Sequence, residues 1–324
     1  MLLAAALALA AVGLWGRLPD PGDFVGALAG ADYGWIALAA ALQVTSLAAF
    51  AWQQRQLLKA LGVRLGAGRV VAVTLARTAL SISLPAGAAV STAYAIREYQ
   101  RAGAGREVVA ASMIVSGLAS IGGLTLLYVT GGAAMVSRDP ALLLSPRPLA
   151  IVAAIAALTA VAVVAGRRRM SRPAPDGAGR PARPEGRVAG FVRSTLASAR
   201  EGWQAGAALR GRDWVTAVLY AAANWLTDLL CLVATCRAVG LPVGVSTLAG
   251  IYLGVQIVRQ VPLTPGGVGI IDTALIAGLT AAGATAVTAA AAVLVYRLLS
   301  CWLLLPAGGI AAVALRHAGP PLQE

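Results

Sequence analysis

Six ionisable side chains interrupt long apolar stretches of this 324-residue sequence, and their types suit the binding of an anion. They are Arg77, Arg97, Asp228, Arg259, Asp272 and Arg297. At the centre of a membrane helix each would cost roughly 2.5–3.5 kcal/mol, so each must face a wet cavity, a counter-charge or an anionic ligand. Arginine suits phosphate, because its planar guanidinium binds two oxygens at once and stays charged. These residues therefore predict a site for an anionic head group.

The same charges could instead pair with one another and serve only the structure. Asp272 could pair with Arg259 or Arg297, and Asp228 could pair with another arginine. Two acids cannot neutralise four arginines, which favours the ligand site. Mutual pairing of every charge in a dry interior would contradict that site. The residues alone leave both interpretations open.

Further candidate groups surround a proline- and glycine-rich break at 262–267. Arg259 precedes the break, Thr264 adds a hydroxyl donor, and the glycines allow the backbone to approach a ligand closely. The ends of broken helices also leave free backbone N–H groups, which favour anions. With Tyr296 as another hydroxyl donor, the predicted substrate-binding residues are Arg77, Arg97, Arg259, Thr264, Gly266, Gly267, Asp272, Tyr296 and Arg297.

Residues for metal or cofactor chemistry are scarce in this sequence. The single histidine, His317, lies near the C-terminus, and the three cysteines, Cys231, Cys236 and Cys301, form no C-x-x-C pair. The sequence contains no P-loop, dinucleotide-binding fingerprint or nucleophile elbow. We therefore expect no cofactor, no metal and no enzymatic activity.

The composition identifies the kind of element that must position these residues. Hydrophobic residues make up 59% of the chain and charged residues 12%, whereas soluble domains contain about 45–50% and about 25%. We predict one all-α, polytopic membrane domain over residues 1–324. Of the net charge of +13, +8 falls within 167–212, which holds eleven arginines and three acids. A cytoplasmic loop beside anionic lipids explains this segment better than nucleic acid binding does.

The apolar segments predict about six full spans, the first of them short and the last kinked at Pro306. They are Met1–Trp15, Tyr33–Leu58, Glu107–Val136, Pro148–Gly166, Trp214–Ala234 and Thr285–Leu315. An interfacial amphipathic helix is predicted within 167–212, after its flexible first half. The basic flanks place both termini and the 167–212 loop on the cytoplasmic side of the cytoplasmic membrane.

Two segments, 70–99 and 245–283, do not resemble simple spans. Each consists of two apolar halves around a Pro/Gly break, and each half is shorter than the ~20 residues that a span needs. We predict two re-entrant hairpins or broken helices that enter from opposite faces, in an inverted-repeat arrangement. In the alternative, 245–261 and 268–283 each cross fully, which gives eight spans.

The second break carries a resemblance to a known family. The stretch from Pro262 to Asp272 resembles the Pro-x-Thr-Pro-Gly-Gly-x-Gly-x-x-Glu signature of the lysylphosphatidylglycerol synthase transmembrane-region family, with Asp272 in place of the glutamate. The tetrapeptide Leu84-Pro85-Ala86-Gly87 with Arg97, and Val295-Tyr296-Arg297-Leu298 with Trp302, are similar to two other motifs of this family. The resemblance covers nearly the whole chain.

The resemblance implies a role in lipid handling. In the full-length synthases this region is thought to flip an aminoacylated lipid that a separate soluble domain makes, and we expect no aminoacyl transfer from this chain. We expect it to translocate an anionic phospholipid or a polyprenyl-phosphate-linked lipid through an arginine-lined cavity between the hairpins. The alternatives are an intramembrane enzyme that modifies lipid phosphates, or a non-transporting partner of an envelope glycosyltransferase. A homo-oligomer is compatible with each.

Overall fold

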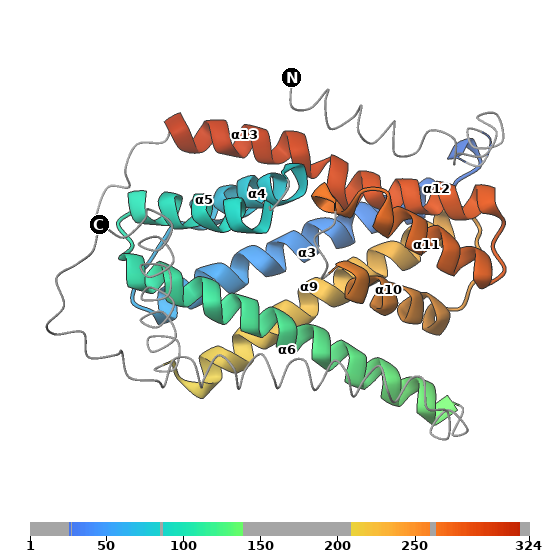
Figure 1. Ribbon diagram of the computed structural model, residues 1–324, viewed down its shortest axis with the longest axis horizontal. Helices are drawn as coiled ribbons and strands as arrows, with labels where there is room; N and C mark the ends of the chain where they lie inside the picture. Colours follow the sequence, from blue (N-terminus) through green and yellow to red (C-terminus); the bar gives the residue numbers. More distant parts are fainter. Residues whose placement is uncertain (1–25, 27, 85–86, 139–208, 260–263, 318–324) are drawn as a thin grey trace, which may run out of the picture. The chain divides into compact units, whose positions relative to one another are not determined.

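The computed structural model describes residues 26, 28–84, 87–138, 209–259 and 264–317, and the regular elements among them are all helical (Figure 1). They are α3 (Tyr33–Ala60), α4 (Ala67–Ser83), α5 (Gly87–Arg101), α6 (Arg106–Arg138), α9 (Gly211–Ala238), α10 (Val245–Arg259), the 3-10 turn η2 (Pro265–Gly267), α11 (Ile270–Ala281), α12 (Ala286–Arg297), the π-helical turn η3 (Leu298–Trp302) and α13 (Leu304–His317). The predicted spans Met1–Trp15 and Pro148–Gly166, and the predicted amphipathic helix, lie outside the described residues.

Four helical segments are long and apolar enough to cross a membrane. They are Tyr33–Ala60, Arg106–Ala133, Gly211–Ala238 and Ala286–His317. These segments correspond to four of the spans predicted from the sequence, and they define a multi-pass helical membrane protein. The helices α10 and α11 are also apolar but shorter than a full span.

The chain divides into two compact units. The long helices α3 and α9 each contribute residues to both units. The first unit contains Met1–Trp52, Gly66–Glu98 and Ala222–Glu324, and the second contains Gln53–Leu65 and Tyr99–Ala221. The candidate functional residues named above all belong to the first unit.

Buried amides hold the helices of the second unit together. The Gln53 side chain donates a 2.8 Å hydrogen bond to the carbonyl of Ala217 in α9, and the Gln54 amide donates to the Ser116 hydroxyl in α6. That hydroxyl donates in turn to Oε1 of Gln53 over 3.2 Å. Leu57, beside these groups on α3, belongs to the unit's small apolar core. Polar bonds of this kind join membrane helices that have no hydrophobic drive to associate.

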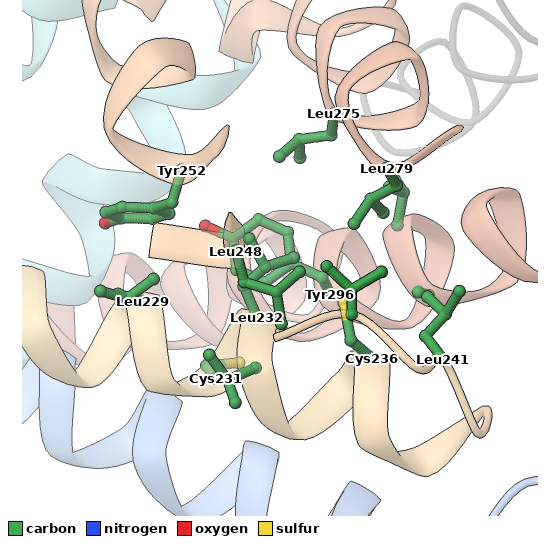
Figure 2. Packing of buried hydrophobic residues seen from close by; sticks show 14 of the residues in the cluster. Leu229, Cys231, Leu232, Cys236, Leu241, Leu248, Tyr252, Leu275, Leu279 and Tyr296 are labelled. Atoms are coloured by element: carbon green, nitrogen blue, oxygen red, sulfur yellow. The ribbon is translucent and has the colours of Figure 1, made fainter. Parts of the chain in front are cut away.

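The core of the first unit is apolar and joins α9, α10, α11 and α12. Figure 2 shows side chains from these helices converging. They include Leu229, Leu232, Leu248, Tyr252, Leu275, Leu279 and Tyr296. Cys231 and Cys236 are buried in the same cluster as free thiols. Close packing of α10 on α11 requires Gly278, because a Cβ there would lie 2.7 Å from Cγ2 of Ile251.

The first Pro/Gly break separates α4 from α5. Leu84 ends α4 in an extended conformation, with φ −116° and ψ 142°, because the residue before a proline is disfavoured in the α region. The N–H of Gly87 donates to the carbonyl of Leu84 over 3.0 Å, and Gly87 begins α5 so close to α4 that a Cβ on it would collide with the backbone of Ser81. The second break lies between α10 and α11 and contains η2. Placement of these helix pairs as re-entrant hairpins in the bilayer stays a prediction.

The last predicted span, Thr285–Leu315, is interrupted one turn before Pro306. The turn η3 is π-helical, and the N–H of Leu303 donates to the carbonyl of Leu298, five residues earlier, over 2.9 Å. Pro306 has no N–H to donate to Trp302, four residues earlier, and its ring would crowd that carbonyl. The irregularity therefore lies directly before the position where the proline removes a regular helical hydrogen bond, and Ser300 and Cys301 within η3 line the candidate site.

The helix α13 packs along α4 through a glycine contact (Figure 1). A Cβ on Gly308 would collide with Cβ of Ala79 and lie 2.6 Å from the carbonyl oxygen of Leu75, whereas a Cβ on the neighbouring Gly309 would meet nothing within 4 Å. Gly308 is therefore required by packing, and Gly309 is not.

We expect Gly308→Ala to lower stability by about 1–3 kcal/mol, because the added methyl must force α13 away from α4. Gly309→Ala is the matched control, since it makes the same change of helix propensity and should stabilise the helix by roughly 0.5–1 kcal/mol. Thermal unfolding of both variants in detergent measures the difference. Equal melting temperatures would show that the two helices do not pack this closely.

Candidate functional site

A cavity of about 660 Å³ lies within the first unit, among α3, α4, α9, the second break and the start of α13. This volume is within the roughly 300–1,000 Å³ of pockets that hold small ligands. Its charged lining residues are Arg77, Asp228, Arg259 and Arg297. Its hydroxyl and amide lining residues are Gln43, Ser46, Thr78, Ser81, Ser91, Asn224, Thr264 and Ser300. The wall is thus cationic and rich in hydrogen-bonding groups.

One arginine of the cavity is held rigidly. The Nε atom of Arg297 lies 2.8 Å from Oδ1 of Asp272, and the two side chains are only 3% and 8% exposed. Arg297 also donates from Nη2 to the carbonyl of Gly266 over 2.9 Å. The other carboxylate oxygen of Asp272 accepts the N–H of Gly269 over 2.8 Å and so caps α11. Of the two pairings left open by the sequence, the structure has Asp272 with Arg297.

The glycines of the break permit this arrangement. Gly266 and Gly267 have φ of +59° and +67°, in the left-handed region that glycine adopts readily. A Cβ on Gly266 would lie 2.9 Å from the Ile82 side chain and 3.1 Å from its carbonyl oxygen, so glycine lets the break approach the end of α4. The Thr264 hydroxyl donates to the carbonyl of Val268 over 3.0 Å and stabilises the turn.

The second arginine, Arg259, is held loosely. Its Nη1 atom lies 4.0 Å from Oδ2 of Asp228, and its side chain is 36% exposed. The same Oδ2 atom accepts hydrogen bonds from the hydroxyls of Tyr252, over 2.7 Å, and Tyr296, over 3.0 Å. We call these four residues the counter-anion cluster. Within it, the carboxylate is satisfied by hydroxyl donors while the guanidinium still faces the cavity.

The remaining predicted residues differ in their relation to the cavity. Arg77 lines it, and its guanidinium stacks over the Phe50 ring at 5.1 Å from the centroid. Arg97 is not among the lining residues; its side chain is 58% exposed and lies 3.8 Å from Glu98. Asp272 and Tyr296 do not line the cavity either, but each contacts a residue that does.

Positive charge exceeds negative charge among the described residues that line the cavity. Arg77, Arg259 and Arg297 line it together with one carboxylate, Asp228, and the Asp272 carboxylate contacts Arg297 from behind the wall. The wall therefore favours an anion over a cation.

Several lining residues were not among those predicted from the sequence. Ser46 and Asn224 bond each other between α3 and α9: the Asn224 amide donates to the Ser46 hydroxyl over 2.7 Å, and that hydroxyl donates to the Asn224 carbonyl over 3.0 Å. Gln43 lies three residues before Ser46, so the helical spacing of polar residues in an apolar span could have indicated this wall. The buried hydroxyl of Ser300 has no hydrogen-bond partner, and no sequence pattern points to it, since its orientation follows from the π turn.

Among the side chains that the structure describes, no three His, Cys, Asp or Glu groups come together as ligands of one ion.

The apolar spans, the exclusively helical elements of the described residues and the charged cavity define a polytopic helical membrane protein. The family model "Lysylphosphatidylglycerol synthase TM region" matches residues 1–308, so this chain belongs to that family. The chain is also similar to a UPF0104 membrane protein of Methanothermobacter thermautotrophicus strain Delta H, with 29% identity over 89 residues. That alignment covers 28% of this chain and about a quarter, 26%, of the relative. Membership of the family points to a role connected with membrane lipids.

Proposed function

We propose that this protein translocates an anionic lipid, a phospholipid or a polyprenyl-phosphate-linked lipid, across the membrane, with the head group in the cationic cavity. The observation that carries the proposal is Arg259, whose guanidinium lines the cavity, is partly exposed and lies at the outer limit of an ion pair with Asp228. Such a guanidinium can bind two phosphate oxygens without first breaking a short ion pair within the protein.

The other parts of the cavity suit the same ligand. Arg77 and Arg297 add positive potential, which suits an anionic head group. Hydroxyl and amide groups such as Asn224 can solvate a polar head group as it leaves water. The family suggests a lipid, and the cavity's charge suggests the sign of its head group.

We further propose an orientation in the cytoplasmic membrane with both termini and the 167–212 loop on the cytoplasmic side. The arginines of that loop favour the anionic leaflet, at about 1 kcal/mol for each basic residue near the surface. In this arrangement the loop would concentrate anionic lipid beside the protein.

Translocation in proteoliposomes tests the proposal. Fluorescent analogues of phosphatidylglycerol, a polyprenyl phosphate and zwitterionic phosphatidylcholine are incorporated separately, and dithionite reports how fast the inner-leaflet probe reaches the outer leaflet. We expect faster loss of fluorescence than in protein-free vesicles for at least one anionic probe, and little acceleration for the zwitterionic one. No acceleration of either anionic probe, or equal acceleration of all three, would contradict selective translocation of anionic lipid.

Two results would support the alternative functions instead. Metal-dependent turnover of a lipid phosphate by the purified protein, without translocation, would favour an intramembrane enzyme. Loss of a complex with an envelope glycosyltransferase on deletion of 167–212, again without translocation, would favour a structural partner.

A further inference from the structure

We propose that Asp228 is the resting counter-anion of Arg259, which the phosphate of the lipid displaces on binding and which recaptures Arg259 when the lipid leaves. The inference rests on the proposed function, because the displacing ligand is the anionic head group proposed there. It adds a role for a carboxylate that the predicted site did not contain.

The counter-anion cluster joins three helices around one oxygen atom. Asp228 comes from α9, Tyr252 and Arg259 from α10, and Tyr296 from α12. Both tyrosine hydroxyls donate to Oδ2, which is also the oxygen nearest to Arg259. Both tyrosines are almost fully buried, so their rings hold the carboxylate in one position and limit its approach to the guanidinium.

The two ion pairs at the cavity differ in a way that assigns them different roles. The nitrogen–oxygen distance of the Arg297–Asp272 ion pair is 2.8 Å, whereas that of the Arg259–Asp228 pair is 4.0 Å. Arg297 is 3% exposed and also bonds the carbonyl of Gly266, but Arg259 is 36% exposed. Arg297 therefore anchors the break, while Arg259 remains available for exchange.

Exchange of partners leaves the Asp228 carboxylate hydrogen-bonded. When phosphate takes Arg259, the Asp228 carboxylate keeps the hydroxyls of Tyr252 and Tyr296, so its desolvation stays compensated. When the lipid departs, the carboxylate again offers a negative charge to the guanidinium. Transport needs binding that is strong enough for entry and weak enough for release, and an internal competitor for Arg259 weakens the bound state.

Removal of this competitor should tighten binding and slow release. Asp228→Asn keeps the side-chain shape and an oxygen acceptor for the tyrosines but removes the charge that competes for Arg259. We expect the Kd of short-chain phosphatidylglycerol to fall about tenfold, and the maximal rate of translocation to fall with it. A residue that only supports the fold would weaken binding when replaced.

Replacement of a tyrosine should change the affinity for the probe in the opposite direction. Tyr252→Phe removes the shorter of the two hydroxyl bonds, so that Asp228 is less well satisfied and pairs more strongly with Arg259. We expect weaker binding of the same probe, by about three- to tenfold. The opposite directions of Asp228→Asn and Tyr252→Phe separate competition for Arg259 from a general loss of structure.

The experiment measures binding and translocation on the same full-length protein. Titration calorimetry in nanodiscs of zwitterionic lipid gives the Kd of short-chain phosphatidylglycerol for wild type, Asp228→Asn, Tyr252→Phe and the double variant Asp228→Asn/Arg259→Ala. Melting temperatures check that each is folded. We expect Asp228→Asn to bring no gain of affinity in a protein that already carries Arg259→Ala, because Asp228 competes with the lipid only for Arg259. Unchanged or weaker binding by folded Asp228→Asn would overturn the proposal, as would a gain that survives without Arg259.

The two proposals fail in different measurements. In one outcome, wild type binds phosphatidylglycerol and the variants change the Kd of this lipid as expected, while no anionic probe is translocated in proteoliposomes. That result would support the counter-anion role and contradict translocation. If wild type translocates anionic lipid but Asp228→Asn binds no more tightly, the counter-anion role alone is wrong. If Asp228→Asn does not fold, an unchanged or lower Kd for Tyr252→Phe overturns the role by itself. Absence of binding and of translocation in wild type would refute both.

Discussion

Proteoliposomes that contain Arg259→Ala are expected to translocate anionic lipid roughly 10- to 100-fold more slowly than those with wild type. A hydrogen bond to a charged group contributes about 1.5–3 kcal/mol, and each 1.4 kcal/mol corresponds to a factor of about ten in rate. The Arg259 guanidinium lies 4.0 Å from its carboxylate partner, whereas Arg297 lies 2.8 Å from its own, so loss of Arg259 should affect the ligand more than the fold. Asp228 retains its two hydroxyl donors in this variant.

Two further variants show whether Arg259 affects the rate of translocation through its charge, its geometry or the net basicity of the protein. Arg259→Lys keeps the charge but loses the planar fork, and we expect a rate between wild type and Arg259→Ala. Arg316→Ala removes one arginine at the exposed end of α13, away from the cavity, and should translocate as wild type does. Equal rates for Arg259→Ala and wild type would mean that this arginine serves only the structure.

Asp272→Ala is expected to produce the largest loss of stability. It leaves the Arg297 guanidinium buried without its carboxylate, and removal of one partner from a buried pair costs about 3–5 kcal/mol. The N–H of Gly269 also loses its acceptor at the start of α11. In thermal unfolding we expect the melting temperature to fall by roughly 10 °C.

A double variant distinguishes a buried charge from a general defect in packing. Asp272→Ala/Arg297→Met removes both charges and keeps an unbranched apolar side chain of similar length, so it should be more stable than Asp272→Ala alone. Additive losses of stability would show that the two residues do not interact. Arg297 also lines the cavity, so its replacement would itself affect translocation. Only the melting temperature of the double variant is therefore compared.

The local structure of the breaks followed from residue chemistry that is visible in the sequence. Leu84 precedes a proline and ends its helix, and Gly266 and Gly267 adopt backbone conformations that other residues rarely do. Pro306 likewise indicated an irregular helix, although the hydrogen-bond shift appears one turn earlier, as a π turn over Leu298–Trp302. Such features depend on a few neighbouring residues, so they can be predicted without knowledge of the fold.

The residues that line the cavity could be predicted from the sequence only in part. A charge in an apolar span must face something polar, which pointed to Arg77, Arg259 and Arg297. The same argument applied equally to Arg97, but this side chain is exposed beside Glu98 instead of lining the cavity. Spacing along one helix does not reveal how the helix is rotated against its neighbours, and that rotation decides which face meets the cavity.

The sequence by itself determined the class of this protein, four spans that the structure contains, the positions of the two Pro/Gly breaks and the excess of arginine over acid near them. These properties depend on composition and on neighbours within a few residues. Only the tertiary structure decided that Asp272 pairs with Arg297, and that Tyr252 and Tyr296 leave Asp228 only a distant partner of Arg259. Each of these contacts joins different helices, so it depends on how the helices pack and not on the order of residues within any one of them.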